Sequence, residues 1–198
     1  YKDEWIQKCI STIRSQTHKD LNFYEIDYNG SDTQLLSDSK FFSIKRENYA
    51  DAMNFIITEA FNDGCDYVFN TNLDDYYSND RIEKQITELE EGYDIVSSDF
   101  CYINEDNKIT LYMNILTHGD IKLNLDKNNN VIAHPCVGYN KNFWSDTENR
   151  YDVSETPQED LELWKRSINR GYKFKIMEDL LLYYRIHNNQ VRKKKYCG

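Results

Sequence analysis

The chain has little proline, no long apolar run and no excess of positive charge. Its 198 residues include 2 prolines and 7 glycines, and 24 basic against 34 acidic residues give a formal net charge of −10. A protein that neutralises nucleic-acid phosphates needs a basic face, so this balance argues against nucleic acid as a partner. No apolar stretch approaches the roughly 18 residues needed to span a bilayer. The short basic run 192–195 is predicted to be a solvated tail, so membrane contact is not expected.

Cysteine is present without a pairing pattern. Cys9, Cys65, Cys101, Cys136 and Cys197 are scattered, odd in number and never arranged as C-x-x-C. This predicts reduced thiols packed as small hydrophobes rather than a disulfide framework or a zinc site. No signal peptide is recognisable. We therefore expect a reducing, cytoplasmic location.

Hydrophobic spacing predicts alternating helices and strands within one domain, for which 198 residues with 39% hydrophobic residues suffice. Helices are predicted over residues 4–15, 49–61, 79–91 and 157–170. Strands are predicted over residues 22–26, 41–45, 66–71, 94–103, 131–139, 172–177 and 180–186. The polar segment 105–130 is predicted to form loops with a strand around 109–115. The alternation indicates an α/β fold with a mostly parallel sheet.

The last predicted helix has the clearest start and stop signals. Thr156 is predicted as its N-cap and Pro157 as its first helical residue. Glu159 completes a capping box with Thr156, and Gly171 is the expected stop. Capping is therefore one explanation for an acidic residue at position 159.

Carboxylates directly follow the strand predicted over residues 66–71. Asn72, Asp74 and Asp75 lie just beyond it, and ligands of α/β sheets bind beyond the carboxyl ends of the strands. Hard oxygen ligands at that edge suit Mg²⁺ or Mn²⁺, which can neutralise a diphosphate leaving group. The alternative is that Asp74 and Asp75 only begin a turn before the next helix.

Seven segments, in order along the chain, resemble motifs of the family 2 glycosyltransferases of the GT-A fold. They are residues 5–10 with 15–17, 26–32, 52–54 (A-x-N), 72–85 (N-L-D-D to I-E-K-Q), 134–135 (H-P), 158–164 (Q-E-D-L-E-L-W) and 184–187 (Y-R-I-H). The resemblance implies a GT-A, Rossmann-like three-layer α/β sandwich. It also implies a single catalytic domain over residues 1–198, with the family's first strand expected before Tyr1.

The function that this resemblance implies is transfer of a sugar, with inversion, from a nucleotide-sugar donor to an acceptor hydroxyl. The donor is most often a UDP-sugar, and the acceptor is a glycan, a protein or a lipid-linked molecule. The implied donor-binding residues are Asp27, Asn54, Asn72, Asp74 and Asp75. Asp74 and His187 are the implied ligands of Mn²⁺ or Mg²⁺.

Asp160 is the implied general base that takes the proton of the acceptor hydroxyl. Helical spacing supports this role, because Asp160 shares a face with Trp164 and Ile168 and its carboxylate is expected to point inward. Glu159 is the second catalytic candidate. The expected acceptor-side residues are His134 and Trp164. The alternative for both motif histidines, His134 and His187, is that each is an ordinary strand residue.

Three other functions remain open from the sequence. A nucleotidyltransferase would use the same fold and the same carboxylate–metal–diphosphate chemistry, but it normally shows a Gly-rich basic loop near its start, which is absent here. A phosphohydrolase would need a nucleophilic aspartate where Asn72 stands. A non-catalytic nucleotide-sugar-binding domain is favoured by Asn72 in place of the motif's first aspartate.

Overall fold

The fold was analysed in a computed structural model, which describes residues 1–113, 121–155, 157–188 and 190. Its helices are α1 (Asp3–Arg14), α2 (Tyr49–Asn62), α3 (Arg81–Glu90), α4 (Ile121–Asp126), α5 (Lys141–Ser145) and α6 (Glu159–Asn169). Its strands are β1 (Tyr24–Asp27), β2 (Lys40–Ser43), β3 (Tyr67–Phe69), β4 (Tyr76–Tyr77), β5 (Ile95–Ile103), β6 (Ile109–Met113), β7 (Gly138–Asn140) and β8 (Phe174–Arg185). Thr156 and the basic run 192–195 lie outside the described residues.

The elements with clear hydrophobic periodicity form where the sequence predicts them. The helix α2, for example, begins after Asn48, whose side chain accepts a hydrogen bond from the backbone N–H of Asp51 at 3.1 Å. It ends before Gly64, which has a φ of +98° and so stops the helix at little steric cost. Its apolar stripe is buried, with Ile57 and Ala60 almost inaccessible to solvent.

The strands form two sheets rather than one. The strands β1 and β2 pair in parallel as a two-stranded sheet, and a six-stranded sheet has the order β3-β7-β5-β8-β4 with β6 beside β5. Within the larger sheet only the β5–β8 pair is parallel, so the expectation of a mostly parallel sheet is wrong. One reason is local: residues 104–108 join β5 and β6 as a tight turn, and such a short connection allows only an antiparallel pair.

The segment 131–139 is not the strand that its apolar residues predict. Residues 134–136 form a 3₁₀ turn around Pro135, which has no N–H to donate to a sheet, and β7 begins only at Gly138. A Cβ atom at Gly138 would lie 2.7 Å from the ring of Phe69 on the neighbouring strand β3, so any larger residue would force that ring to move. The two strands predicted over 172–186 merge into the single long strand β8.

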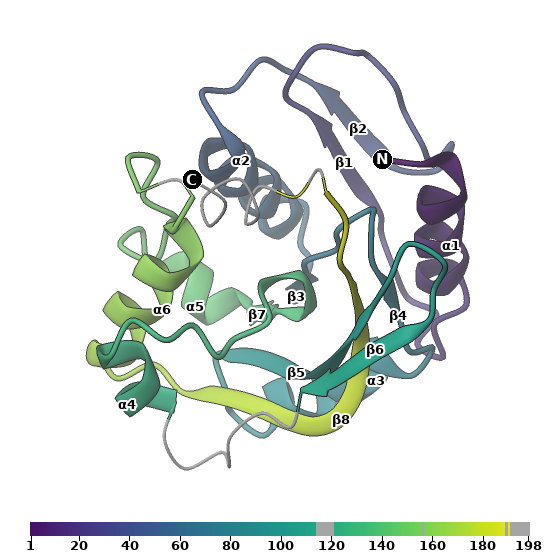
Figure 1. The fold of residues 1–198 in the computed structure, drawn as a ribbon. Helices are drawn as coiled ribbons and strands as arrows, with labels where there is room; N and C mark the ends of the chain where they lie inside the picture. Colours follow the sequence, from purple (N-terminus) through teal and green to yellow (C-terminus); the bar gives the residue numbers. More distant parts are fainter. Residues whose placement is uncertain (114–120, 156, 189, 191–198) are drawn as a thin grey trace.

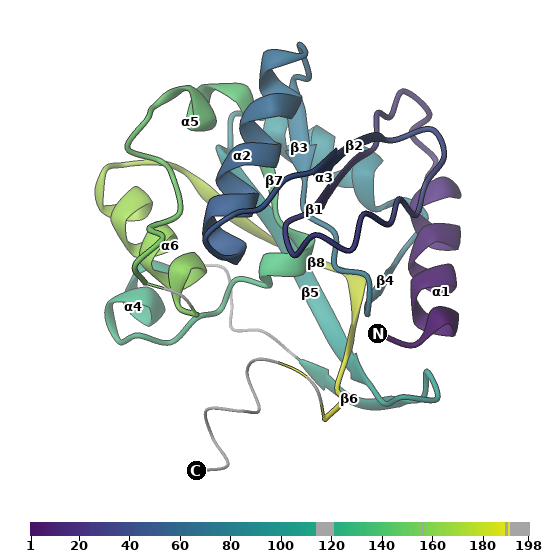
Figure 2. The ribbon, with the colours of Figure 1, turned by 90° about the horizontal axis from the view of Figure 1, so that it is seen from above.

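Helices cover both faces of the larger sheet, which gives three layers. Figures 1 and 2 show α1, β1 and β2 on one side of the molecule and α4, α5 and α6 on the other. One core lies under α2, α5 and α6 and contains Trp144 and Trp164, and a second core contains Cys9, Leu89 and Val96. The described cysteines are free thiols, as expected.

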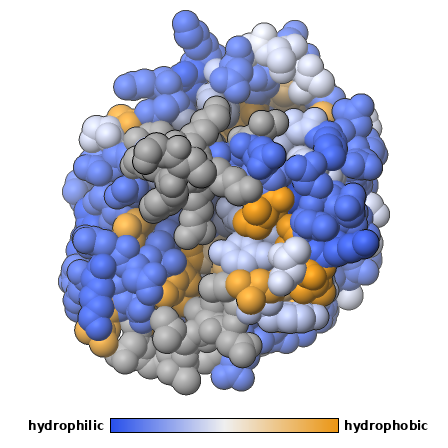
Figure 3. Space-filling view, viewed as in Figure 1, coloured by the Kyte–Doolittle hydropathy of each residue, from blue (hydrophilic) through white to orange (hydrophobic). Residues whose placement is uncertain are grey.

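The outer face drawn in Figure 3 is largely hydrophilic, with hydrophobic side chains gathered beside β6. There Ile109 and Leu111 are 42% and 54% exposed. No helix within the described ranges has the length and apolar character needed to cross a bilayer.

Candidate active site

A cleft of about 1880 Å³ lies between the β1–β2 sheet, the end of β3 and the start of α6. Its walls bring together residues that are far apart in the sequence. The predicted site residues that line it are Asp27, Asn72, Asp74, His134, Glu159 and Asp160. The predicted site residues that do not line it are Asn54, Asp75, Trp164 and His187.

Asp74 and His187 meet at the end of β3, beside the cleft. The Nε2 atom of His187 lies 3.0 Å from Oδ2 of Asp74, and the two side chains are 3% and 8% exposed. The ring of His187 packs against Trp5 of α1, with 5.0 Å between the ring centroids. The other carboxylate oxygen of Asp74, Oδ1, is buried and has no hydrogen-bond partner among the described residues. The predicted metal-binding pair is therefore close together, with an uncommitted oxygen.

Asp75 has a supporting position rather than a place in the cleft. It is 1% exposed, and its Oδ1 accepts a hydrogen bond from the backbone N–H of Arg185 at 2.8 Å. Burial is the main cause that raises the pKa of Asp75 well above its usual value, and the negative charge of Asp74 is the second. The carboxyl group of Asp75 thus ties the end of β8 to the turn that presents Asp74.

The buried guanidinium of Arg185 connects three parts of this region. Its Nε donates to the backbone carbonyl of Asp74 at 2.7 Å. Its Nη1 donates to the carbonyls of Asn104 and Glu105 at 2.9 and 3.2 Å, and its Nη2 donates to Oδ1 of Asn107 at 2.7 Å. Asn107 has a φ of +63°, which turns its amide toward the guanidinium at the tip of the β5–β6 turn. Arg185 therefore fixes the backbone that carries Asp74.

Asp27 organises the loop at the end of β1. Its Oδ1 accepts from the backbone N–H groups of Asn29 and Gly30 at 3.0 and 3.1 Å. Its Oδ2 accepts from the Ser31 hydroxyl at 2.7 Å and from the N–H of Asp32 at 2.6 Å. The bond from Ser31, followed by the bonds from the loop amides, lowers the pKa of Asp27. The carboxylate lines the cleft, but its lone pairs are largely used within its own loop.

The two asparagines expected to bind the donor have different environments. The side chain of Asn72 lines the cleft directly after β3. The side chain of Asn54 instead clamps the backbone of Tyr151, donating to its carbonyl at 2.8 Å and accepting from its N–H at 2.9 Å. Asn72 is thus accessible from the cleft, whereas Asn54 has a structural role.

His134 rests on a buried polar network. Its Nε2 atom lies 2.8 Å from the hydroxyl of Tyr151 and 3.1 Å from Nδ2 of Asn70. The Tyr139 hydroxyl receives a hydrogen bond from the same Asn70 amide at 2.9 Å and also contacts the Tyr151 hydroxyl. Burial lowers the pKa of His134, so the imidazole is mainly neutral at pH 7. His134 reaches the cleft on the side expected for the acceptor.

Trp164, the other residue expected on the acceptor side, is a core residue. Its exposed fraction is 0%. Its ring centroid lies 6.1 Å from that of His134 and 6.2 Å from that of Tyr139. Trp164 therefore supports the wall of the cleft from behind, and direct contact with an acceptor is not available to it in this structure.

The two carboxylates at the start of α6 differ in their partners. Asp160 accepts from the N–H of Leu161 at 2.7 Å and from Nδ2 of Asn130 at 2.8 Å. Glu159 is 8% exposed, and its Oε2 is buried without a hydrogen-bond partner among the described residues. Burial raises the pKa of Glu159. Both residues line the cleft, with Asp160 bonded and Glu159 only partly satisfied.

The start of α6 lies two residues later than predicted, at Glu159. Gln158 is its N-cap residue, and no side-chain hydrogen bond caps the helix there. The predicted capping box with Thr156 cannot be assessed, because Thr156 lies outside the described residues.

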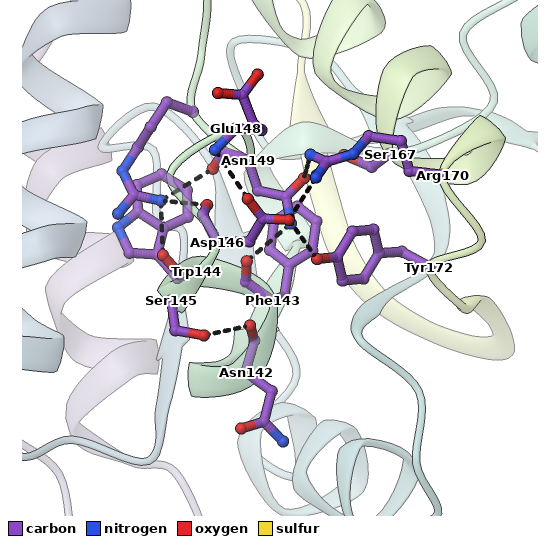
Figure 4. Close-up of polar contacts among 11 residues, drawn as sticks. Asn142, Phe143, Trp144, Ser145, Asp146, Glu148, Asn149, Ser167, Arg170 and Tyr172 are labelled. Carbon is purple, nitrogen blue, oxygen red and sulfur yellow. Dashed lines mark hydrogen bonds and ion pairs between the residues drawn. The ribbon is translucent and has the colours of Figure 1, made fainter.

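Polar contacts behind α6 fix its position (Figure 4). Nη2 of Arg170 donates to Oδ2 of Asp146 at 2.5 Å, and the Tyr172 hydroxyl donates to the same oxygen at 2.8 Å. Nδ2 of Asn149 donates to the carbonyl of Phe143 at 2.8 Å, and its Oδ1 accepts from Arg170 at 3.1 Å. These bonds tie the residues that follow α6 to the loop after α5, and so fix the end of α6 opposite to the carboxylates.

The donor set at Asp74 and His187 fits a hard divalent cation. Within the described ranges no group of three or more His, Cys, Asp or Glu side chains is arranged as a metal site. Mg²⁺ is nevertheless commonly held by one or two carboxylates together with substrate phosphates and water. The unpartnered, buried Oδ1 of Asp74 is the atom that such an ion would satisfy.

Sequence reasoning assigned no role to Asn70, Tyr151 or Arg185. Arg185 carried a usable signal, because it is a charged residue inside the predicted apolar strand 180–186. An unpaired charge there would be costly, so a buried partner network was to be expected. Asn70 contacts His134 and Tyr139 across 64 and 69 residues of sequence, and Tyr151 contacts Asn54 across 97, so no local pattern reveals their positions.

Comparisons with known proteins identify a family from the sequence and a fold from the structure. The model of Glycosyl transferase family 2 matches residues 2–146. The crystal structure of Staphylococcus aureus TarS 1–349 in complex with UDP-GlcNAc is 12% identical and superposes with a TM-score of 0.70, over 95% of this chain and 56% of that one. The same protein in complex with UDP gives 12% identity and a TM-score of 0.68, over 93% and 57% of the two chains.

A197 from STIV is more distant, with 10% identity and a TM-score of 0.51 over 83% of this chain and 85% of that one. The chain spans 57% of the length of the TarS 1–349 structure with UDP. No curated protein matches the sequence. The structural matches identify the fold as GT-A, as the sequence predicts.

Proposed function

Because the chain belongs to glycosyl transferase family 2, we propose that it transfers a sugar from a UDP-sugar to an acceptor hydroxyl, with inversion and with a divalent metal ion. The observation that carries the proposal is the pairing of Asp74 and His187 beside a cleft that Glu159 and Asp160 also line. The former pair suits a diphosphate–metal complex, and the latter suits removal of a proton.

A cation is needed on the donor side for a further reason. Among the described residues that line the cleft there is no lysine, and Arg81 is the only arginine. Arg81 is 1% exposed, and it donates to Gln85 at 2.8 Å and to the carbonyl of Asn70 at 2.8 Å. The charge of a diphosphate therefore lacks a free protein cation there. Mn²⁺ or Mg²⁺ held by Asp74 and His187 would supply that charge when bound.

The roles of the remaining residues follow from their positions. Asn72 would hydrogen-bond the donor, a role supported by its position in the lining of the cleft, and Asp27 holds the loop at the end of β1 against which the nucleotide would lie. Asp160 takes the proton of the acceptor hydroxyl while the oxygen of that hydroxyl bonds to the anomeric carbon. The bond from that carbon to the diphosphate breaks at the same time, and UDP leaves with the electron pair. Attack from the side opposite the leaving group inverts the anomeric centre.

The test is a screen of UDP-sugars for transfer with Mn²⁺ present, followed by the Asp160→Asn variant. The amide keeps the shape of the side chain but cannot accept the proton, so donor binding should persist while transfer falls roughly 10²–10⁴-fold. Asp152→Asn, at an exposed position outside the cleft, is the matched control. Transfer by Asp160→Asn at a near wild-type rate, or a larger loss in Glu159→Gln, would contradict the assignment of the base. UDP binding with no transfer from any donor would favour a non-catalytic binding domain.

A further inference from the structure

The end of the cleft at α6 has a distinctive lining. Its wall is built from the loop after α4 and from the start of α6. The side chains there are amides and carboxylates, from Asn128, Asn129, Asn130, Gln158, Glu159 and Asp160. On the proposed function this end receives the acceptor, because Asp160 must reach the acceptor hydroxyl.

Among the described residues, no lysine or arginine lines this wall. Lysine is absent from the described residues that line the cleft, and the single arginine, Arg81, has its guanidinium committed to Gln85 and to the Asn70 carbonyl. Lys165 does not line the cleft, but its ammonium donates to Oδ1 of the wall residue Asn128 at 2.7 Å. A phosphate or sulfate placed here would face two carboxylates, with no lysine in the described lining of the cleft, and such a like-charge contact is of the kind that suppresses wrong partners.

One carboxylate oxygen of the wall, Oε2 of Glu159, has no hydrogen-bond donor among the described residues. This oxygen is buried, and Glu159 is one of the residues that line the cleft. A buried carboxylate oxygen without a donor is unfavourable, and a hydroxyl or an ammonium group from a ligand would satisfy it. Asp160, in contrast, already accepts from Asn130 and Leu161.

We propose that the acceptor carries no negative charge where it enters the cleft, and that one of its hydroxyl or amino groups donates a hydrogen bond to Glu159. This inference rests on the proposed function only for the statement that the α6 end is the acceptor end. It defines the acceptor class as neutral or amino-bearing glycans, and it excludes glycans and polymers whose reacting unit is phosphorylated or sulfated.

The test is binding of labelled protein, with UDP and Mn²⁺ present, to an array that holds neutral glycans beside their amino-bearing, sulfated and phosphorylated counterparts. Neutral or amino-bearing glycans should bind at least about tenfold more tightly than their anionic counterparts. The Asn129→Lys variant places a cation on the wall and should narrow that difference. Glu159→Gln should reduce binding of amino-bearing glycans more than binding of neutral ones, because it removes the charge but keeps a hydrogen-bond acceptor.

A variant with Lys193, Lys194 and Lys195 replaced by glutamine separates the wall from the basic run at the end of the sequence. The ranking of the glycans should be the same in this variant. Equal or tighter binding of anionic glycans, no glycan binding of any kind, or a ranking that depends on the basic run would overturn the inference.

Calorimetry of UDP with Mn²⁺ on the same protein keeps the two proposals apart. Nucleotide binding with a preference for anionic glycans rejects the acceptor class alone, and selective binding of neutral glycans without nucleotide binding rejects the proposed function alone.

Discussion

Nε2 of His187 lies 3.0 Å from Oδ2 of Asp74, although 113 residues separate them in the sequence. The contact forms because β8 runs alongside β5 and returns to the edge of the sheet where β3 ends. Arg185, two residues before His187, locks that return by bonding the Asp74 carbonyl. The Asp74–His187 pair is therefore a product of the β8 path and of one buried guanidinium.

The first prediction concerns this pair. UDP should raise the melting temperature much more with Mn²⁺ than in chelator, because a ligand that binds only the folded state stabilises it by mass action. Asp74→Ala and His187→Ala should each remove most of that synergy, and the double variant should lose little more than the more severe single one, because the residues share one ion. Thermal unfolding with and without Mn²⁺ measures both effects.

Asp126→Ala, which changes an exposed carboxylate on α4, should keep the synergy. His187→Ala should also lower the melting temperature in chelator, because the ring is buried against Trp5, so each variant is compared with its own chelator value. If UDP raised the melting temperature equally with and without chelator, the assignment of a metal ion to this site would be wrong.

The second prediction concerns Glu159 and pH. Burial raises the pKa of Glu159 in the folded protein above its ordinary value of 4.5. A carboxyl group with a raised folded-state pKa contributes stability below the unfolded pKa, and that contribution is lost as pH rises through the folded pKa. The free energy of unfolding of Glu159→Gln relative to wild type should therefore increase between about pH 4 and pH 7. Urea unfolding at several pH values measures it.

Glu155→Gln, at an exposed position in the loop before α6, is the matched control and should show no such trend. A difference between Glu159→Gln and wild type that stays constant with pH, or that shrinks as pH rises, would mean that the Glu159 carboxylate is stabilised in the folded protein by a partner.

The third prediction concerns Arg185. A lysine at this position cannot reproduce the bonds to Asp74, Asn104 and Asn107 at the same time, because it lacks the planar fork of the guanidinium. Arg185→Lys should lower the melting temperature by about 5 °C or more, as breaking a buried polar network costs about 2–4 kcal/mol. It should also raise the Mn²⁺ concentration needed for half-maximal stabilisation by UDP, because the Asp74 backbone loses its support.

Arg14→Lys is the control, because Arg14 forms an exposed pair with Asp38 and such pairs contribute little. Asn107→Gly keeps the left-handed turn but removes one acceptor, so its effect on stability should be smaller than that of Arg185→Lys. If Arg185→Lys shifted the melting temperature without changing the response to Mn²⁺, the guanidinium would stabilise the fold but would not position the metal site.

The sequence predicts best what depends on local patterns. The apolar periodicity of α2 and the carboxylates after β3 are visible within short windows, and both are found where expected. The segment 131–139 misleads because its apolar residues suit a strand, while Pro135 lacks the donor that a strand needs. The proline is the stronger signal, since a missing N–H cannot be repaired by packing.

Contacts between distant segments set the limits of prediction for the site. Asn54 matches a family motif, yet its amide bonds the backbone of Tyr151 across 97 residues, which no spacing rule reveals. Trp164 shares a helical face with Asp160 as predicted, but that face turns progressively into the core along α6. A shared face therefore placed Asp160 at the cleft and could not place Trp164 there.

Because β1 pairs only with β2, the two-stranded sheet is expected to open more readily than the six-stranded sheet. Within the described residues no ladder bond joins this two-stranded sheet to the six-stranded one, so it can open without breaking a hydrogen bond of the larger sheet. Amide hydrogens of 24–27 and 40–43 are expected to exchange with solvent sooner than those of β5 and β8. The Asp27 loop belongs to this two-stranded unit, so part of the binding free energy of a nucleotide would be used to order the loop. Slower amide hydrogen exchange in β1 would then indicate that the base of the nucleotide has bound.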